Sequence, residues 1–391
     1  MQRETALGGA LGERLTGLGR AGRVHRWWPF ALAALLVVAA VSDRHSWPAD
    51  TGLFTAGGRL LLSPGWLGVF GDPILQVGVA QLSFYAVVSD VEAALGLPRY
   101  LLLSVLIQVG VLVAALGAAA LPFRLVQRPT PPLLLLGVGF VATTLGLGSA
   151  IFRSGHPAQV VIAATWVVAG LLARRGRPVT AGLLLAIGMA WEPWGLLGAP
   201  VLLLAPRMAE TAKASATALI ASATWYVPFA LLGEFRMGEF DWTVRPGSVL
   251  APLLGVGSAF GWELRLLQAS LAVAVGSVVA LALRRSAHAL WAVPLATATA
   301  RLAVDPVGAS YYWVLVQLLA LMALATFLAT RDRVGWVAWP LLYPLFVPLG
   351  PGLRAGFGLA AVAVVVLHTW PQGRLPLEPR APTATPAAQT G

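Results

Sequence analysis

Four residues that can take part in acid–base or phosphate chemistry follow directly after the first long apolar run of this chain. Asp43, Arg44, His45 and Asp50 lie within eight residues, in a sequence of which only 11% is charged. A carboxylate can act as the general base that deprotonates a hydroxyl group, and an arginine can bind phosphate oxygens. Asp50 precedes "TGLF", so it also suits the N-terminal cap of a short helix. The pattern leaves both roles open for Asp50.

Further polar side chains stand in short segments between the later apolar runs. Glu192 lies in "WEPW", where Pro193 disfavours helix at the residue before it. An ionised carboxylate in apolar surroundings is costly and often functional. Tyr311 in "SYYW" suits either a binding site or an aromatic belt at a membrane interface. The candidate binding residues are His45, Arg153, His156, Glu192, Asp241, Arg245, Arg301, Asp305 and Tyr311.

The sequence lacks the motifs of several other chemistries. It contains no P-loop, no GxGxxG pattern after a strand and no HExxH pattern, which argues against a nucleotide site and a zinc protease. It contains no cysteine, so disulfides and thiolate metal sites are excluded. We therefore expect no cofactor and assign no metal ligands. The pattern leaves open whether the loop carboxylates assist through a divalent cation.

The composition indicates a membrane protein. Hydrophobic residues make up 58% of the 391 residues, and the mean hydropathy is +0.78. Soluble domains carry about 25% charged residues, more than twice the share found here. The net charge of +11 comes from short arginine clusters between apolar runs, which is typical of cytoplasmic loops. No continuous basic patch is present to bind nucleic acid.

The apolar runs predict an all-α protein, a polytopic transmembrane bundle of about twelve helices. Each span needs about 20 residues. Residues 178–206 are too long for one span and are broken at "WEPW", so we interpret them as a hairpin of two short helices. This places the basic "APRMAETAK" on the same side as the other arginine clusters. The other predicted spans are residues 27–42, 99–121, 132–151, 157–173, 213–233, 262–283, 288–304, 308–330, 334–350 and 354–370.

The charge pattern also predicts how the chain is divided and oriented. Residues 1–26 form a basic N-terminus, residues 27–370 the membrane domain, and residues 371–391 a disordered tail. The positive-inside rule places both termini in the cytoplasm and all the candidate residues outside. Residues 52–98 then form a long external loop with helices lying at the membrane interface. The Ala, Gly and Arg bias points to a bacterial plasma membrane.

Several motifs resemble the GT-C superfamily of membrane glycosyltransferases. An Asp shortly after the first span, then "LFTAGGRLLLSPGWLGVF", a "DP" and "QVGVAQL", are similar to that superfamily's first external loop. More narrowly, the chain resembles the bacterial polyprenyl-phosphate-mannose-dependent mannosyltransferases of glycosyltransferase family 87. Motifs that contribute to this are "GHPAQ", "WEPWGLLGAPVLLL", "FDWTVRPGS", "WELRLLQ" and "RLAVDPVGASYYW". They are short and spread over most of residues 27–370.

The resemblance implies a hexosyltransferase with an extracytoplasmic active site. Its donor would be a sugar, mannose above all, on polyprenyl phosphate, and its acceptor a membrane glycolipid or glycan hydroxyl. Transfer would invert the anomeric carbon. The family's loop carboxylate maps onto Asp50, with Asp43 in reserve, although many members have a closer acidic pair. The remaining roles would be donor phosphate binding by Arg153, His156 and Arg301, and sugar or acceptor binding by Glu192, Asp305 and Tyr311.

Two other functions are compatible with the residues. A transporter or flippase of lipid-linked sugars would place ionisable groups near the bilayer midplane on broken helices, and only the interrupted segment 178–206 favours it. A non-catalytic scaffold for envelope assembly would need none of the loop carboxylates. It should tolerate Asp50→Ala, which an enzyme that uses Asp50 as its base should not.

Overall fold

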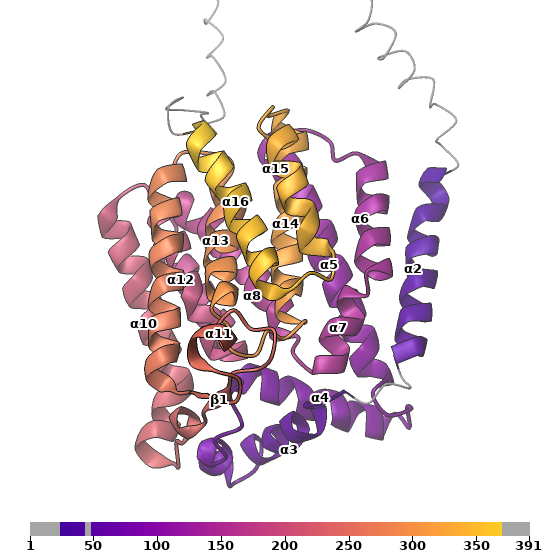
Figure 1. The fold of residues 1–391 in the computed structure, drawn as a ribbon. Coiled ribbons are helices and arrows are strands. Elements are labelled where there is room, and N and C mark those ends of the chain that lie inside the picture. Colours follow the sequence, from indigo (N-terminus) through magenta and orange to yellow (C-terminus); the bar gives the residue numbers. More distant parts are fainter. Residues whose placement is uncertain (1–23, 44–47, 370–391) are drawn as a thin grey trace, which may run out of the picture.

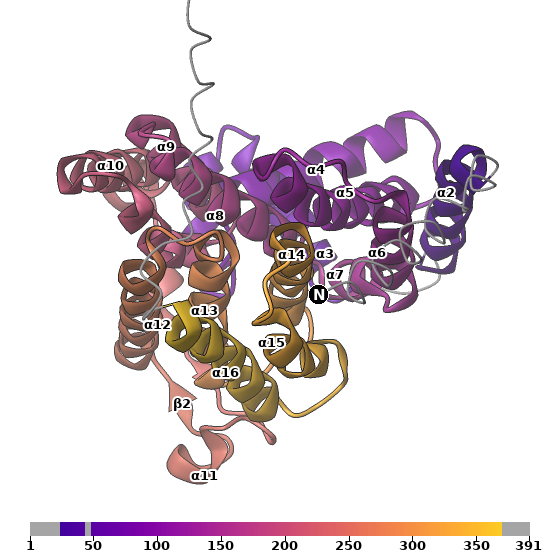
Figure 2. The same cartoon turned by 90° about the horizontal axis from the view of Figure 1, so that it is seen from above.

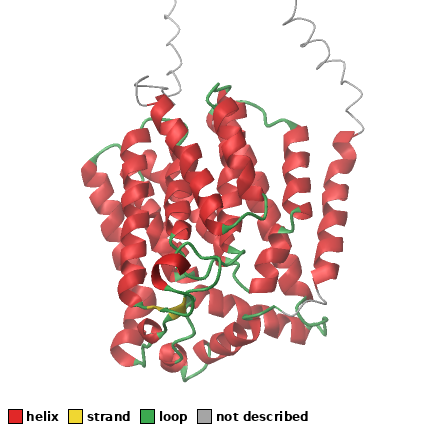
Figure 3. Ribbon diagram, viewed as in Figure 1, coloured by secondary structure: helices red, strands yellow, loops and turns green. Residues whose placement is uncertain are grey.

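The chain folds into a bundle of upright helices with a layer of shorter helices across one end (Figure 1). The computed structural model describes residues 24–43 and 48–369. Within these ranges the β structure is limited to β1 (Trp242–Thr243), which pairs antiparallel with β2 (Ala259–Phe260). Helices make up nearly all the remaining regular structure (Figure 3). The predicted all-α class of membrane protein is confirmed.

Six helical segments among the described residues are long and apolar enough to cross a membrane. Their lengths run from 19 to 25 residues, which matches the roughly 20 residues that a bilayer core requires. They are α5 (Leu101–Leu125), α6 together with α7 (Pro132–Ser154), α10 (Met208–Leu232), α12 (Trp262–Leu283), α14 (Tyr312–Thr330) and α16 (Pro351–Thr369).

Two of the helices form the centre of the bundle because they have no polar face. In α13 (Ala289–Ala303) every residue from 289 to 302 is buried, and most of α14 is buried too. Such helices pack against protein on all sides. Four apolar helices are shorter than the six above, and 15 residues of helix reach only about 22 Å. They are α8 (Ala158–Arg174), α9 (Pro178–Trp191), η3 (Pro193–Leu204) and α13.

Two of the predicted spans are interrupted in the structure, whereas the first is not. The first, residues 27–42, coincides with one helix, α2 (Val24–Asp43). Residues 132–151 are divided into α6 (Pro132–Thr144) and α7 (Leu147–Ser154), because Gly146 takes a left-handed φ of 65°. Residues 334–350 are divided into α15 (Gly335–Leu342) and η5 (Tyr343–Phe346), where Pro340 and Pro344 lack the N–H groups of a regular helix.

Segment 178–206 is a helical hairpin, as the "WEPW" motif predicts. Glu192 is extended, with φ −156° and ψ 133°, and separates α9 from η3. The two arms meet where a Cβ on Gly195 would overlap the backbone of Gly188. Trp166 of α8 donates a hydrogen bond to the Gly195 carbonyl at 2.6 Å. The hairpin therefore holds Glu192 at the end of the bundle that also receives the start of α8.

The predicted interfacial helices of residues 52–98 lie across this end of the bundle (Figure 1). The first and last of these helices pack closely because Gly58 has no side chain. A Cβ at this position would overlap the Leu82 carbonyl. Glu92 joins the layer to the bundle, since its carboxylate accepts hydrogen bonds from Tyr100 N at 2.9 Å and Leu103 N at 3.1 Å. An anion suits the start of α5. The layer consists of α3 (Thr51–Leu61), η2 (Trp66–Gly71) and α4 (Val79–Ala94).

The opposite end of the bundle gathers the arginine clusters. Arg128 donates to the Ala329 carbonyl at 2.6 Å, and Arg174 donates to the Ser286 carbonyl at 2.8 Å. Arg284 reaches the Ala205 carbonyl at 3.1 Å. Loops that are far apart in the sequence therefore meet there. The candidate residues Asp50, His156 and Glu192 lie at the other end, whereas Asp332, His288 and His368 are acidic and histidine residues at the arginine-rich end.

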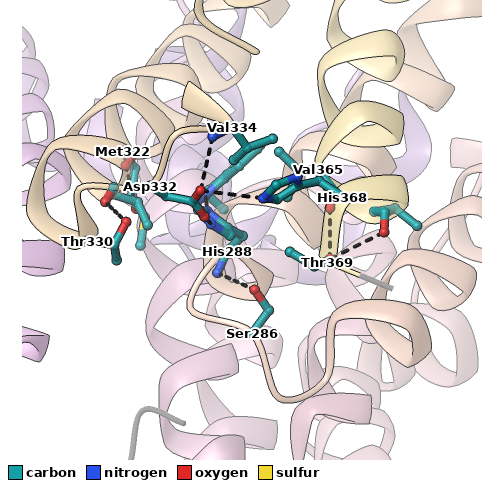
Figure 4. Close-up of polar contacts among 12 residues, drawn as sticks. Ser286, His288, Met322, Thr330, Asp332, Val334, Val365, His368 and Thr369 are labelled. Carbon is teal, nitrogen blue, oxygen red and sulfur yellow. Dashed lines mark hydrogen bonds and ion pairs between the residues drawn. The ribbon is translucent and has the colours of Figure 1, made fainter. Parts of the chain in front are cut away.

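One polar cluster at the arginine-rich end connects α13, the loop after α14, and α16 (Figure 4). Asp332, between α14 and α15, lies 2.8 Å from His288 Nε2 and 3.7 Å from His368 Nε2. Trp291 donates its indole N–H to His288 Nδ1 at 3.3 Å. His288 Nε2 therefore carries the ring proton and donates it to Asp332. The cluster connects the start of α13 to the last turn of α16.

Candidate active site

The carboxylate of Asp50 faces the imidazole of His156. The distance from Asp50 Oδ2 to His156 Nε2 is 3.2 Å, and the Asp50 side chain is 48% exposed, whereas that of His156 is 9% exposed. Asp50 precedes α3 but makes no side-chain cap hydrogen bond. Its backbone is held nearby, because Ala49 N donates to the Arg153 carbonyl at 2.9 Å. Asp50 therefore occupies the N-cap position of α3, but its carboxylate does not cap the helix and is directed at His156.

The turn that carries His156 depends on a glycine. Gly155 has a φ of 79° and ends α7, a conformation that is strained for residues with a Cβ. A Cβ there would also lie 3.3 Å from Thr51 Oγ1. Pro157 follows and precedes the first turn of α8. The "SGHP" sequence thus turns the chain sharply and brings His156 to the start of α3.

A second carboxylate lies on the other side of the imidazole. Glu192 Oε1 is 4.0 Å from His156 Nδ1, and Glu192 Oε2 accepts a hydrogen bond from Gln159 Nε2 at 2.8 Å. Burial raises the pKa of Glu192 above its usual range, while the nearby His156 acts in the opposite direction. Asp50, His156 and Glu192 therefore form a carboxylate–imidazole–carboxylate row. One end of it is half exposed and the other is buried.

Aromatic rings fix the orientation of this imidazole. The Tyr311 ring stacks on His156 with centroids 4.3 Å apart and planes 1° from parallel. Phe54 meets the same imidazole edge-on at 5.3 Å. Tyr311 in turn touches Tyr312, at 4.4 Å between centroids. With its plane held on two sides, the imidazole keeps its nitrogens directed at the two carboxylates.

Arg301 and Asp305 form a buried pair next to this row. Arg301 Nη2 is 3.6 Å from Asp305 Oδ2, and Arg301 is only 8% exposed. The guanidinium lies between the rings of Trp194 and Tyr312, 4.4 Å from each centroid, an arrangement that stabilises a cation. Asp305 Oδ1 accepts hydrogen bonds from the N–H groups of residues 307 and 308, which fixes the carboxylate.

Glu192, Arg301 and Asp305 line a cavity of about 670 Å³. The size is typical of small-molecule sites. The cavity is largely apolar, and its polar groups lie among aromatic rings. Other lining residues include Gln76, Trp194, Tyr226, Trp242, Trp262, Arg265, Gln268 and Tyr312.

Arg265 is a lining residue that the sequence analysis did not single out. Its Nη1 donates to Gln76 Oε1 at 2.7 Å, and its Nη2 donates to the Phe240 carbonyl at 2.7 Å. Among the described residues, neither Arg265 Nε nor Arg301 Nη1 has a hydrogen-bond partner, although both atoms are buried. The signal in the sequence was a lone Arg one turn inside an apolar helix. The cavity thus presents two guanidinium donors that suit an anionic group.

Asp43 and Arg153 line a different cavity, of about 700 Å³, beside α2, α6 and α7. Asp43 is fully buried, and its Oδ2 accepts hydrogen bonds from Gln108 Nε2 at 2.7 Å and Ser149 Oγ at 3.0 Å. Arg153 Nε lies 3.9 Å from Asp43 Oδ1. Ser310 also lines this cavity. The two candidate bases are therefore in different surroundings, one buried and anchored, the other half exposed.

Not every candidate residue lines one of these cavities. Asp50, His156 and Tyr311 line neither, although His156 lies 4.0 Å from Glu192, which lines the 670 Å³ cavity. Asp241 and Arg245 are exposed, and neither lines the wall of either cavity described above. The backbone N–H of Arg245 donates to the Pro306 carbonyl at 2.9 Å. His45 lies outside the described residues. In the part of the chain that the structure describes, no three His, Asp or Glu side chains are arranged to hold a metal ion.

Comparison with protein-family models, with curated proteins and with solved structures found no match for this chain. A functional proposal therefore rests on the geometry of the site and on the motifs of the sequence. That geometry combines a half-exposed carboxylate, a fixed imidazole, and a cavity with one buried and one half-buried guanidinium group. The carboxylate can accept the proton of a hydroxyl group, and the cavity can bind an anion.

Proposed function

We propose that the chain is a membrane glycosyltransferase that moves a sugar from a polyprenyl-phosphate donor to a hydroxyl group of a lipid or glycan. The resemblance to family 87 favours mannose. The protein lies in a bacterial plasma membrane with about twelve crossings, and both termini are cytoplasmic. The described site faces the extracytoplasmic side. The membrane lipids around it supply the donor, and the acceptor belongs to the cell envelope.

The observation that carries this proposal is the pair of guanidinium groups in the 670 Å³ cavity, that of Arg301 buried and that of Arg265 half-buried. Arg265 Nε and Arg301 Nη1 are free to donate to the oxygens of a phosphodiester. Trp194 and Trp242 line the same wall and offer apolar surface to a sugar face or an isoprenoid chain. Asp305 is fixed near Arg301 and can accept hydrogen bonds from sugar hydroxyls.

The reaction forms one C–O bond and breaks another. The acceptor oxygen attacks the anomeric carbon of the donor while the bond from that carbon to the phosphate oxygen breaks. The hydroxyl proton passes to the half-exposed carboxylate of Asp50, and the polyprenyl phosphate leaves with the bonding electron pair. Arg265 and Arg301 stabilise the charge that develops on the leaving phosphate. Attack from the side opposite the phosphate inverts the anomeric carbon.

His156 and Glu192 position the base in this mechanism. His156 Nε2 is 3.2 Å from Asp50 Oδ2, so its N–H directs one carboxylate oxygen and leaves the other for the acceptor. Glu192, at 4.0 Å from Nδ1, holds the far side of the ring. Neither residue has to accept the proton for the bonds to balance. A general base of this kind contributes about 10²–10⁴-fold to the rate.

Purified wild type and Asp50→Asn, incubated with polyprenyl-phosphate-mannose and a membrane glycolipid extract, test the proposal. We expect wild type to transfer mannose and Asp50→Asn to lose about 10²-fold or more in rate. Asp90→Asn is the matched control, because Asp90 is exposed and pairs with Arg59 at 2.9 Å on the neighbouring helices. It should transfer at the wild-type rate. Equal rates for wild type and Asp50→Asn would remove Asp50 from the chemistry.

Movement of lipid-linked sugars is the second candidate function, and the break at Glu192 favours it. Glu192 is a buried carboxylate at the interruption of the α9–η3 hairpin and lines the cavity, a feature shared with transporters. Reconstitution in proteoliposomes separates the two functions. A transporter moves labelled donor across the bilayer without forming a new glycosidic bond, whereas the enzyme forms that bond. A chain that does neither, with a panel of donors, is a scaffold.

A further inference from the structure

An apolar hairpin projects from the bundle beside the 670 Å³ cavity. It consists of β1, β2 and the loop between them, residues 242–260, with the short α11 (Ala251–Leu254) at its tip. Viewed from above, α11 lies at the edge of the molecule, beyond α12 and α16 (Figure 2). The side chains at this tip are unusually exposed for their type, since Leu253 is 77% and Val256 is 61% exposed.

The tip differs in composition from the loop that precedes it. Residues 246–262 contain no charged side chain, whereas residues 233–245 contain Glu234, Arg236, Glu239, Asp241 and, at the base of the hairpin, Arg245. Arg236 and Glu239 form an exposed ion pair at 2.7 Å. The charged loop therefore suits water. An exposed, uncharged group of aliphatic side chains suits an apolar phase.

The position of the hairpin beside two long apolar helices indicates that the apolar phase is the lipid bilayer. α12 begins at Trp262, directly after β2, and a Cβ on Gly352 in the first turn of α16 would lie 2.6 Å from Val249 Cγ2. Both α12 and α16 are long enough to span a membrane. The tip consequently lies beside the ends of two membrane-spanning helices. Exposed Leu266 and Leu267 continue the apolar surface along α12.

The hairpin is joined to the functional site at its base. Trp242 and Phe260, paired across β1 and β2, both line the cavity. Ser248 Oγ donates to the Asp305 carbonyl at 2.7 Å. A small core of its own, formed by Val244, Leu250 and Phe260, makes the hairpin a packed unit. The tip is therefore connected through this packed unit to the wall that holds Asp305.

We infer that residues 242–260 form a membrane-inserted gate, whose tip enters the lipid leaflet and whose base opens the cavity wall to lipid chains. The partner is the bilayer itself, and the contact consists of the exposed aliphatic residues Val249, Leu253, Leu254 and Val256. For the enzyme proposed above, on which this second step rests, the gate is where an isoprenoid chain passes from the leaflet into the cavity. The insertion of the tip into the membrane does not depend on the activity proposed for the site.

Spin labels on single cysteines test the insertion. The chain contains no cysteine, so Leu253→Cys and Arg236→Cys each give one labelled site in the full-length protein in lipid nanodiscs. We expect the label at residue 253 to collide with oxygen more than with a water-soluble nickel complex, and the label at residue 236 to do the reverse. Equal access of nickel to both labels would overturn the inference. Val256→Cys serves as a second tip site if Leu253→Cys does not fold.

A kinetic measurement tests the gate separately. In the double variant Leu253→Asp with Val256→Asp, we expect KM for a long-chain polyprenyl-phosphate donor to rise roughly fivefold, because a carboxylate is costly inside the lipid leaflet. KM for a short-chain, water-soluble donor should stay unchanged. An equal rise for both donors would exclude the gate. If wild type transfers no sugar at all, the proposed function fails, while the spin-label result still decides whether the tip is inserted.

Discussion

At the scale of single residues, the two aspartates near the first helix have different surroundings and should have different roles. Asp43 accepts hydrogen bonds from Gln108 and Ser149 and is buried, whereas Asp50 is half exposed and faces His156. A buried carboxylate with two donors anchors helices. A half-exposed carboxylate beside an imidazole can reach a substrate.

Asp43→Ala is therefore expected to destabilise the fold more than it impairs the chemistry. It leaves Gln108 and Ser149 without their acceptor, which costs about 1–3 kcal/mol, so Tm in detergent should fall. Transfer per folded molecule should persist. Asp50→Asn should show the opposite pattern, with an unchanged Tm and lost transfer. A variant of Asp43 that keeps its Tm but loses all transfer would make Asp43 the base.

Glu192 gives a pH-dependent prediction. Burial raises the folded-state pKa of Glu192. The protonated Glu192 therefore contributes its full stabilisation only at a pH below the unfolded-state pKa. This stabilisation declines as the pH rises through the ordinary value toward the raised one. Glu192→Gln removes this decline and keeps an acceptor for Gln159 Nε2. We expect the variant to have a higher Tm than wild type near about pH 8 and a similar Tm near about pH 4.

Thermal-shift measurements at the two pH values check this. Glu239→Gln is a suitable control, because Glu239 is exposed and forms a surface ion pair with the exposed Arg236. This substitution should not alter the pH dependence of Tm. If Glu192→Gln and wild type lose Tm equally on going to alkaline pH, the buried carboxylate is not the cause.

The sequence predicted most of the residues of the site. It did not predict that Asp43 and Arg153 line a different cavity from Glu192, Arg301 and Asp305. Asp50, His156, Glu192, Arg301, Asp305 and Tyr311 lie at one end of the bundle, where the loops predict them. Arg265 was missed because a lone arginine inside an apolar helix gives no sign of which neighbours it meets. Its partner Gln76 comes from a loop 189 residues away. Spacing along the chain carries no such information.

At the scale of elements, the existence of helices was predictable and their interruptions were not. Gly146 and Pro344 interrupt runs whose apolar composition is continuous, and only packing decides whether such residues bend or end a helix. The break at "WEPW" was visible because a charge accompanied the proline. In a chain with so few polar residues, a charged residue marks the end of a helix better than a glycine or proline alone does.

The cluster of Asp332 with His288 and His368 gives a prediction for α16. The hydrogen bond from His288 lowers the pKa of Asp332, so its contribution to stability is present above the ordinary carboxyl pKa. It is lost as the pH falls through the lowered value. Asp332→Asn should therefore lower Tm at neutral pH, with the difference shrinking in acid. Hydrogen exchange should become faster at the C-terminal turn of α16, where His368 lies.

The control for this cluster is Asp90→Asn. Asp90 belongs to an ion pair whose two side chains are each 57% exposed, and such pairs contribute little to stability. Its removal should leave both Tm and the exchange rates of α16 as they are in wild type. A loss of Tm in Asp332→Asn that persists unchanged in acid would show that packing, and not the charge of Asp332, holds the helices.

At the scale of the whole molecule, the charges of the chain are divided between its two ends. The arginine clusters meet at one end through bonds such as Arg174 to Ser286, and the site lies at the other. Cytoplasmic loops carry the excess of arginine in membrane proteins. The site should therefore face outward, where a polyprenyl-phosphate donor in the outer leaflet can reach it.

Single cysteines in this cysteine-free chain test that orientation directly. Arg236→Cys lies in an exposed loop at the end of the site, and Arg175→Cys lies in an exposed loop at the arginine-rich end. On intact cells, a membrane-impermeant maleimide should label residue 236 at once and residue 175 only after permeabilisation. The reverse pattern would turn the cavity toward the cytoplasm. The donor would then have to come from the inner leaflet, and an envelope acceptor outside the cell would be beyond the reach of Asp50.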